Sequence, residues 1–269
     1  MKIEEIKISE TAVLRSYICG EYNEMPVGRR DAMLVLPGGG YFRCSEREAE
    51  PVVKKYLAAG LNVFLLYYSC GGDAKGFKPL IEASAAMKYI RENAAAFNID
   101  PKRVFAVGFS AGGHLAASLG TFFDDPYIKE KAGIVGEENR PTGVIAAYPV
   151  ISGVEGAVKS CFYNILGTDK PSEEEMKRWS VELHVKETAS PAFIWATADD
   201  PIVPVINSVR YAEALGRAGV PFELHIFQSG PHGLSTADFE TAAGLDKSLY
   251  LNERVAKWVD LSIGWLKLL

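Results

Sequence analysis

The sequence predicts an α/β fold in which a mostly parallel sheet has helices on both faces. Short apolar runs alternate with longer segments of helical period along the 269-residue chain. Most of these runs lack the strict polar–apolar alternation of a half-exposed strand. A strand that is apolar on both faces is typical of a parallel sheet covered on both sides, whose ligand crevice lies at the carboxyl ends of the strands.

Six short apolar runs are predicted as strands, and two longer segments are predicted as helices because each has one apolar face. The alternating order predicts a single domain over residues 1–269, with no linker or internal repeat. The segment 151–190 interrupts the alternation. It is either a small lid or a surface excursion that only connects strands. The predicted strands are 32–36, 63–68, 104–107, 144–148, 192–197 and 222–227, and the predicted helices cover 80–97 and 251–266.

Composition and charge exclude several classes of protein. Hydrophobic residues make up 48% of the chain, which is enough for a substantial core, and the net charge is −5 without clustered Lys or Arg. We therefore expect no nucleic-acid partner. No apolar run approaches the ~18 residues of a membrane span, so we expect no membrane partner and a cytoplasmic location. The four cysteines are spread without a CxxC pair, which predicts reduced thiols rather than a zinc site or a disulfide framework.

The segment Gly-Phe-Ser-Ala-Gly at residues 108–112 matches the pattern G-x-S-x-G. A predicted strand lies directly before it and a helical pattern directly after it, as a nucleophile elbow requires. Such a turn forces the serine into a strained conformation, and glycine at both ends avoids a collision across the bend. Ser110 is therefore the predicted nucleophile. The N–H of Ala111, at the start of the helix, is the first predicted oxyanion donor.

A triple glycine follows the first predicted strand, in Pro-Gly-Gly-Gly-Tyr at residues 37–41. A phosphate loop would need Lys-Ser/Thr after its glycines, and a dinucleotide fingerprint would need G-x-G-x-x-G opening a helix. Neither is present. The segment matches better the glycine loop that supplies oxyanion donors in lipases and esterases.

This loop, together with Gly-Phe-Ser-Ala-Gly-Gly-His-Leu-Ala-Ala at residues 108–117, resembles the α/β-hydrolase superfamily. The resemblance is to its bacterial acetylesterase-like branch, often labelled xylan or carbohydrate esterase, and covers roughly residues 31–232. It implies the α/β-hydrolase fold, with Gly39 and Gly40 as further oxyanion donors. Pro37 stands where the hormone-sensitive-lipase branch has His, so the substrate preferences of that branch are not carried over.

Only four histidines are available as the catalytic base. His114 lies one helical turn after the nucleophile and cannot reach over it, so we expect it to pack in the core. His184 lies in the interrupting segment and His225 within a predicted strand, so neither is favoured. His232 follows the last predicted strand in a flexible loop and is the predicted base, because its ordinary pKa near 6.5 allows it to take and return a proton.

The acid is expected directly after the predicted strand 192–197, where two carboxylates are adjacent. The segment 197–204 resembles the Asp-Asp-x-Val-Val-Pro motif of related peptidases and esterases, in which the first Asp belongs to the triad. Asp199 is therefore predicted to orient the imidazole. Asp200 is predicted to bond the turn backbone, as Asx residues commonly do.

Together these residues predict a serine esterase that needs no metal or cofactor. The resemblance to the acetylesterase-like branch implies small acetyl-type esters and suggests acetylated oligosaccharides as substrates. Tyr41, Tyr148 and Trp179 are candidates for a sugar-facing pocket, although such aromatics are more often core residues. Two alternatives remain. A serine peptidase of the prolyl-oligopeptidase type is disfavoured because no propeller precedes residue 31. A hydrolase-fold binding protein with little turnover is disfavoured because no triad member is missing. The oligomeric state is left open.

Overall fold

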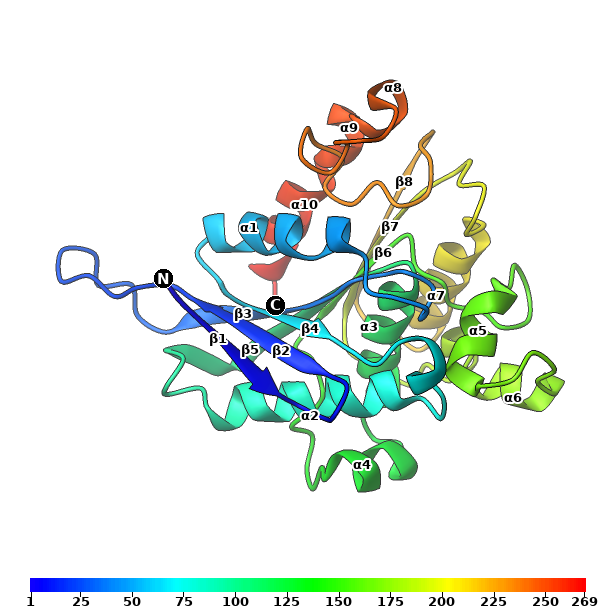
Figure 1. Ribbon diagram of the computed structural model, residues 1–269, viewed down its shortest axis with the longest axis horizontal. Coiled ribbons are helices and arrows are strands. Elements are labelled where there is room, and N and C mark those ends of the chain that lie inside the picture. Colours follow the sequence, from blue (N-terminus) through cyan, green and yellow to red (C-terminus); the bar gives the residue numbers. More distant parts are fainter.

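All eight strands join one sheet in the computed structural model, which describes residues 1–269 (Figure 1). Their order is β1-β2-β4-β3-β5-β6-β7-β8, and every pairing from β4 to β8 is parallel. The six predicted strands are all present, which confirms the predicted α/β class. The strands are β1 (Lys2–Lys7), β2 (Val13–Ile18), β3 (Arg30–Leu36), β4 (Asn62–Tyr67), β5 (Ile99–Phe109), β6 (Val144–Ala147), β7 (Ala192–Thr197) and β8 (Phe222–Phe227).

The N-terminal strands β1 and β2 were not predicted. They pair antiparallel with each other, and β2 pairs antiparallel with β4 at one edge of the sheet. Five of the six residues of β1 are exposed and one is partly buried, so this strand lacks the apolar signal on which the other strand predictions rested.

Helices cover both faces of the sheet because successive side chains of each strand point to opposite sides. In β3, Met33 and Val35 pack in the same core as α1 and α10, whereas Leu34 and Leu36 pack with α2, α3 and α7. The helices are α1 (Glu50–Ala58), α2 (Lys78–Glu92), α3 (Ala111–Thr121), α4 (Pro126–Ala132), α5 (Lys159–Leu166), α6 (Glu173–Arg178), α7 (Ile206–Arg217), α8 (Lys247–Tyr250), α9 (Glu253–Ala256) and α10 (Trp258–Leu266). None of them is both long and apolar enough to cross a membrane.

The interrupting segment 151–190 forms α5 and α6 near the carboxyl ends of the strands (Figure 1). Phe162 and Ile165 of α5 are buried in the core that also contains α2 and α3. Ser172 and Glu175 form a capping box at the start of α6. The segment is therefore packed onto the domain by its own apolar residues.

His114 of α3 lies in the core, as expected, and joins two loops there. In a neutral imidazole, its Nε2–H donates to the carbonyl oxygen of Trp179 over 2.9 Å, and its Nδ1 accepts from the hydroxyl of Tyr41 over 2.8 Å. Burial lowers the pKa of His114 to about 4. The imidazole is thus neutral in the folded protein at neutral pH.

We predict that His114 makes the protein lose stability as the pH falls from about 6.5 to about 4. The unfolded chain binds a proton near its ordinary pKa, whereas the folded chain resists that proton down to about 4, so unfolding is favoured by on the order of 3 kcal/mol at the acid end of this window. Urea unfolding of wild type and His114→Gln across this pH range measures the effect. Equal slopes of unfolding free energy against pH in the two proteins would contradict it.

Candidate active site

A strained turn between β5 and α3 presents Ser110 at the carboxyl end of the sheet. Ser110 has φ 54° and ψ −116°, outside the regions that L-residues ordinarily occupy. A Cβ on Gly108 would lie 1.9 Å from the carbonyl oxygen of Gly112, and a Cβ on Gly112 would lie 2.1 Å from that of Leu36. Only glycine fits at these two positions, as the sequence predicted.

Three side chains from three strand ends form a continuous chain of hydrogen bonds. His232 Nε2 lies 2.8 Å from Ser110 Oγ, and His232 Nδ1 lies 2.7 Å from Asp200 Oδ2. The Asp200 side chain is only 1% exposed. With the imidazole neutral, Nδ1–H donates to the carboxylate, and Nε2 is left to accept the serine proton. This is the geometry of an activated nucleophile.

The prediction of Asp199 as the orienting acid is wrong in the structure. Asp199 is exposed and points toward the loop after β8, where it accepts from Ser229 Oγ over 2.6 Å and from the N–H of Gly230 over 2.8 Å. These two hydrogen bonds lower the pKa of Asp199. Asp200 turns inward instead, because the chain reverses at this point and adjacent side chains leave it in different directions.

Asp200 also fills the turn role that the sequence predicted for it. Its Oδ1 accepts from the N–H groups of Ile202 and Val203 over 2.8 and 3.0 Å, while its Oδ2 contacts His232. One carboxylate thus fixes both the turn after β7 and the imidazole.

The glycine loop places free N–H groups beside the serine. Gly39 and Gly40 have φ +119° and +66°, and neither N–H donates to any atom of the chain. Both glycines line the same hollow as Ser110. Ala111 is the first residue of α3, where backbone N–H groups have no partner within the helix. Gly39 and Gly40 thus share the hollow of Ser110, and Ala111 directly follows Ser110 in the chain. Their role as oxyanion donors stays a prediction.

Glu48 is a buried carboxylate of this site that the sequence did not identify. Its Oε2 accepts from the N–H of Gly38 over 2.8 Å, and its Oε1 accepts from the hydroxyl of Tyr148 over 2.6 Å. The Tyr148 hydroxyl in turn accepts from the N–H of Ser235, and its ring meets the His232 ring edge to face at 5.1 Å between centroids. Burial raises the pKa of Glu48. This carboxylate connects the glycine loop to the histidine loop.

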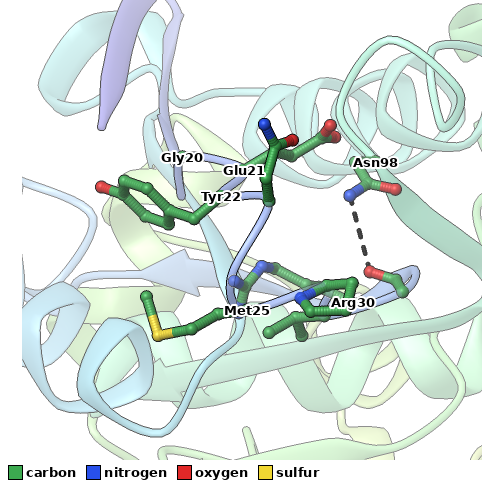
Figure 2. Close-up of a pocket in the computed structure, with 10 residues that line it drawn as sticks. Gly20, Glu21, Tyr22, Met25, Arg30 and Asn98 are labelled. Carbon is green, nitrogen blue, oxygen red and sulfur yellow. Dashed lines mark hydrogen bonds between the residues drawn. The ribbon is translucent and has the colours of Figure 1, made fainter.

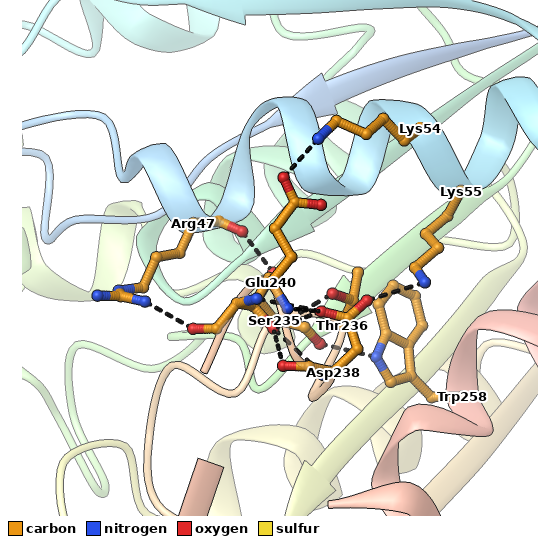
Figure 3. Close-up of polar contacts among 9 residues, drawn as sticks. Arg47, Lys54, Lys55, Ser235, Thr236, Asp238, Glu240 and Trp258 are labelled. Carbon is orange, nitrogen blue, oxygen red and sulfur yellow. Dashed lines mark hydrogen bonds and ion pairs between the residues drawn. The ribbon is translucent and has the colours of Figure 1, made fainter. Parts of the chain in front are cut away.

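The segment that follows His232 forms hydrogen bonds and an ion pair with the region around α1 (Figure 3). Ser235 donates from its hydroxyl to the carbonyl of Arg47 over 2.7 Å and accepts at its own carbonyl from the indole N–H of Trp258 over 2.8 Å. Farther along, Lys55 pairs with Asp238. The loop that carries the imidazole is therefore held on one side by the region around α1 and on the other by Trp258.

A hollow of about 360 Å³ opens over Ser110 and His232. The other side chains that surround it come from four regions: the glycine loop, α5, the turn after β7, and the segment after His232. They include Arg43, Ser45, Arg47, Glu48, Val158, Ser160, Cys161, Ile202, Val203, Leu245 and Tyr250.

The expectation that Tyr41, Tyr148 and Trp179 line a sugar-facing pocket is wrong in the structure. Their exposed fractions are 1%, 2% and 9%, and none of them lines the hollow. Tyr41 and Tyr148 use their hydroxyls on buried partners, and Trp179 stacks on Phe77. The aromatic side chain at the hollow is Tyr250, which lies in a polar stretch near the C-terminus and carries no motif.

A second hollow, of about 380 Å³, lies where the β2–β3 loop passes Arg30 and Asn98 (Figure 2). Arg30 begins β3 and Asn98 directly precedes β5, so this hollow is at the amino ends of the strands, opposite the serine. No group of three or more His, Cys, Asp or Glu side chains is arranged to hold a metal ion.

The BD-FAE family model matches residues 23–215. Endo-1,4-beta-xylanase B of Butyrivibrio fibrisolvens is 38% identical over 234 residues, covering 85% of this chain and 36% of that protein. Acetylxylan esterase of Xylanibacter ruminicola is 32% identical over 216 residues, covering 78% of this chain and 42% of that protein. The chain thus spans less than half the length of these relatives.

Solved structures match along nearly the whole chain. The acetyl ester-xyloside bifunctional hydrolase from Caldicellulosiruptor lactoaceticus aligns with a TM-score of 0.81 at 31% identity, covering 98% of this chain and 95% of that chain. The alpha/beta hydrolase MGS-M1, from a deep-sea metagenome library, aligns with a TM-score of 0.81 at 34% identity, covering 99% of this chain and 97% of that chain. The predicted α/β-hydrolase fold is confirmed.

We predict that Ser110 reacts with a fluorophosphonate probe at a rate that depends on Asp200 and not on Asp199. Asp200→Asn should slow labelling by about 10⁴, because the amide favours the wrong imidazole tautomer. Asp199→Asn, the matched neighbour, should label within a few-fold of wild type. Mass spectrometry of the labelled peptide over time measures both rates, and slow labelling of Asp199→Asn alone would restore the original assignment.

Proposed function

We propose, from the premise that this chain belongs to the BD-FAE family and has the α/β-hydrolase fold, that it is a serine carboxylic ester hydrolase. The observation that carries the proposal is the unbroken hydrogen-bond chain from Asp200 through His232 to Ser110, beside the free N–H groups of Gly39 and Gly40. The family match bears out the resemblance to acetylesterase-like hydrolases that the sequence indicated. The cytoplasmic location and the single domain stay predictions.

In the proposed reaction, Ser110 Oγ attacks the ester carbonyl carbon while its proton passes to His232 Nε2. The carbonyl oxygen becomes an oxyanion that accepts hydrogen bonds from the N–H groups of Gly39, Gly40 and Ala111. Collapse of this intermediate breaks the bond to the alcohol, which leaves with the proton from Nε2. Water then attacks the acyl-serine by the same steps, giving up its proton to Nε2, and the released serine takes that proton back.

The proposed substrates are small acyl esters of sugars. Two of the matched proteins are named as an acetylxylan esterase and an acetyl ester-xyloside hydrolase, which supports this substrate class. The site supports a short acyl group as well. Cys161 of α5 lies 3.9 Å from the position of a Cβ on Gly40, so the helix forms a wall close to the proposed oxyanion donors.

The function is tested with Ser110→Ala on p-nitrophenyl acetate. Loss of the nucleophile should lower kcat by on the order of 10⁶, because triad members act as a unit. An unchanged circular dichroism spectrum and melting temperature would show that the fold is intact. Wild-type turnover in this variant, or no hydrolysis of any acetyl ester by wild type, would refute the proposal. The second result would favour the binding-protein alternative.

We predict that kcat/KM falls from acetyl and butyryl to octanoyl esters of p-nitrophenol, because the wall at α5 limits the space for the acyl chain. Cys161→Gly removes a buried α5 side chain that lines the hollow and should raise the octanoyl-to-acetyl ratio of kcat/KM. The control on the same helix is Tyr163→Ala, because Tyr163 is half-buried and does not line the hollow. A ratio that rises with chain length in wild type would instead indicate a lipase-like site.

A further inference from the structure

The hollow over Ser110 continues into a polar extension of about 550 Å³. The two spaces share Arg43, Ser45, Arg47 and Leu245 as lining residues. The active site is therefore longer than the space needed for an acetyl group and its ester bond. The extension has room for a further part of the substrate, beyond the acetyl group and the ester bond.

The extension lies on the side of the leaving alcohol. His232 Nε2 must reach the alcohol oxygen to protonate it, so the alcohol has to point toward the chain around His232. The extension is bounded by the segment that follows His232, including Thr241 and Leu245. Arg47 is bound to this segment through its own carbonyl, which accepts from Ser235, and through its Nη1, which donates to the carbonyls of Thr241 and Ala243.

Two arginines dominate the charge of this extension. Neither Arg43 nor Arg47 forms an ion pair with a carboxylate of the chain, although other arginines, such as Arg15 and Arg103, do. Arg43 is exposed and its side chain donates to no atom of the chain, and Arg47 keeps its Nε and Nη2 without an acceptor.

The carboxylates nearby do not cancel this charge. Glu240 lines the extension but is paired with Lys54 (Figure 3). Glu46 is the one lining carboxylate without an ion pair. It is accompanied by the unpaired Arg43 guanidinium and by the Arg47 guanidinium, which donates to two backbone carbonyls. With Lys54 counted, three basic and two acidic side chains lie around the extension, in a chain whose net charge is −5.

We propose that Arg43 and Arg47 form a subsite for a carboxylate on the alcohol part of the ester. An example is an acetylated saccharide that also carries a uronic acid. Guanidinium groups recognise carboxylates through paired N–H donors, and Arg47 is already oriented by its two backbone contacts. Tyr250 also lines the hollow over Ser110 and offers an aromatic face for a sugar ring there. This inference rests on the proposed esterase function and adds the charge of the substrate to it.

The test compares two acetyl esters that differ only in the charge of the alcohol, 4-acetoxybenzoate and 4-acetoxybenzamide. The measured quantity is the ratio of their kcat/KM values, because a general loss of activity cancels in the ratio. Arg43→Gln should lower the benzoate-to-benzamide ratio about three- to tenfold, the range for a partly exposed charge-assisted contact. Arg43→Gln/Arg47→Gln should lower it further. The wild-type ratio should also fall between about 0.02 M and about 0.5 M salt.

Arg29→Gln is the matched control, because Arg29 is an exposed arginine in the β2–β3 loop at the opposite end of the strands. It should leave the ratio unchanged. A ratio that stays at the wild-type value in both Arg43→Gln and the double variant overturns the subsite. Failure of wild type to hydrolyse even the neutral benzamide would instead refute the esterase function, and the subsite with it.

Discussion

The close packing of the Ser110 turn against the end of β3 determines where the rest of the site lies. Gly112 passes so near the carbonyls of Leu36 and Pro37 that no side chain fits between them. Gly38 also lies close to the turn, since a Cβ there would lie 2.6 Å from the carbonyl oxygen of Phe109. The two loops are therefore in contact where they leave their strands, and this contact places the glycine loop beside the serine. Backbone sterics, more than any ion pair, fix this arrangement.

The parts of the site that follow from local sequence could be predicted. Ser110 and its flanking glycines form one short motif between a predicted strand and a predicted helix, and this motif can be identified from the local sequence. His232 could be predicted because the superfamily places its histidine after the last strand. Which of the two adjacent aspartates contacts the imidazole could not be predicted from local sequence. Asp199 and Asp200 are adjacent, and which of them faces the imidazole depends on how the chain turns after β7. In the structure the inward residue is the one that also caps the turn at Ile202 and Val203.

Residues whose surroundings come from distant segments were missed or misassigned. Glu48 lies among charged residues in the sequence and reads as a solvated position, yet it is 4% exposed and connects Gly38 with Tyr148. Tyr148 was a candidate for a sugar-facing pocket. It lies beneath His232 instead, since its hydroxyl finds the buried Glu48 carboxylate. Burying either group without the other would leave an unpaired polar atom.

The contacts between α1 and the segment after His232 join residues that are far apart in the chain. Ser235 and Arg47 are separated by 188 positions, and Trp258 holds the same loop from nearer the C-terminus. During synthesis the serine turn and the glycine loop are complete long before these partners leave the ribosome. The nascent chain can thus fold its parallel core while the imidazole is still unplaced. His232 is the last residue of the Asp200–His232–Ser110 chain to be synthesised, so a nascent chain that ends before it holds the serine turn without the base that would activate the serine.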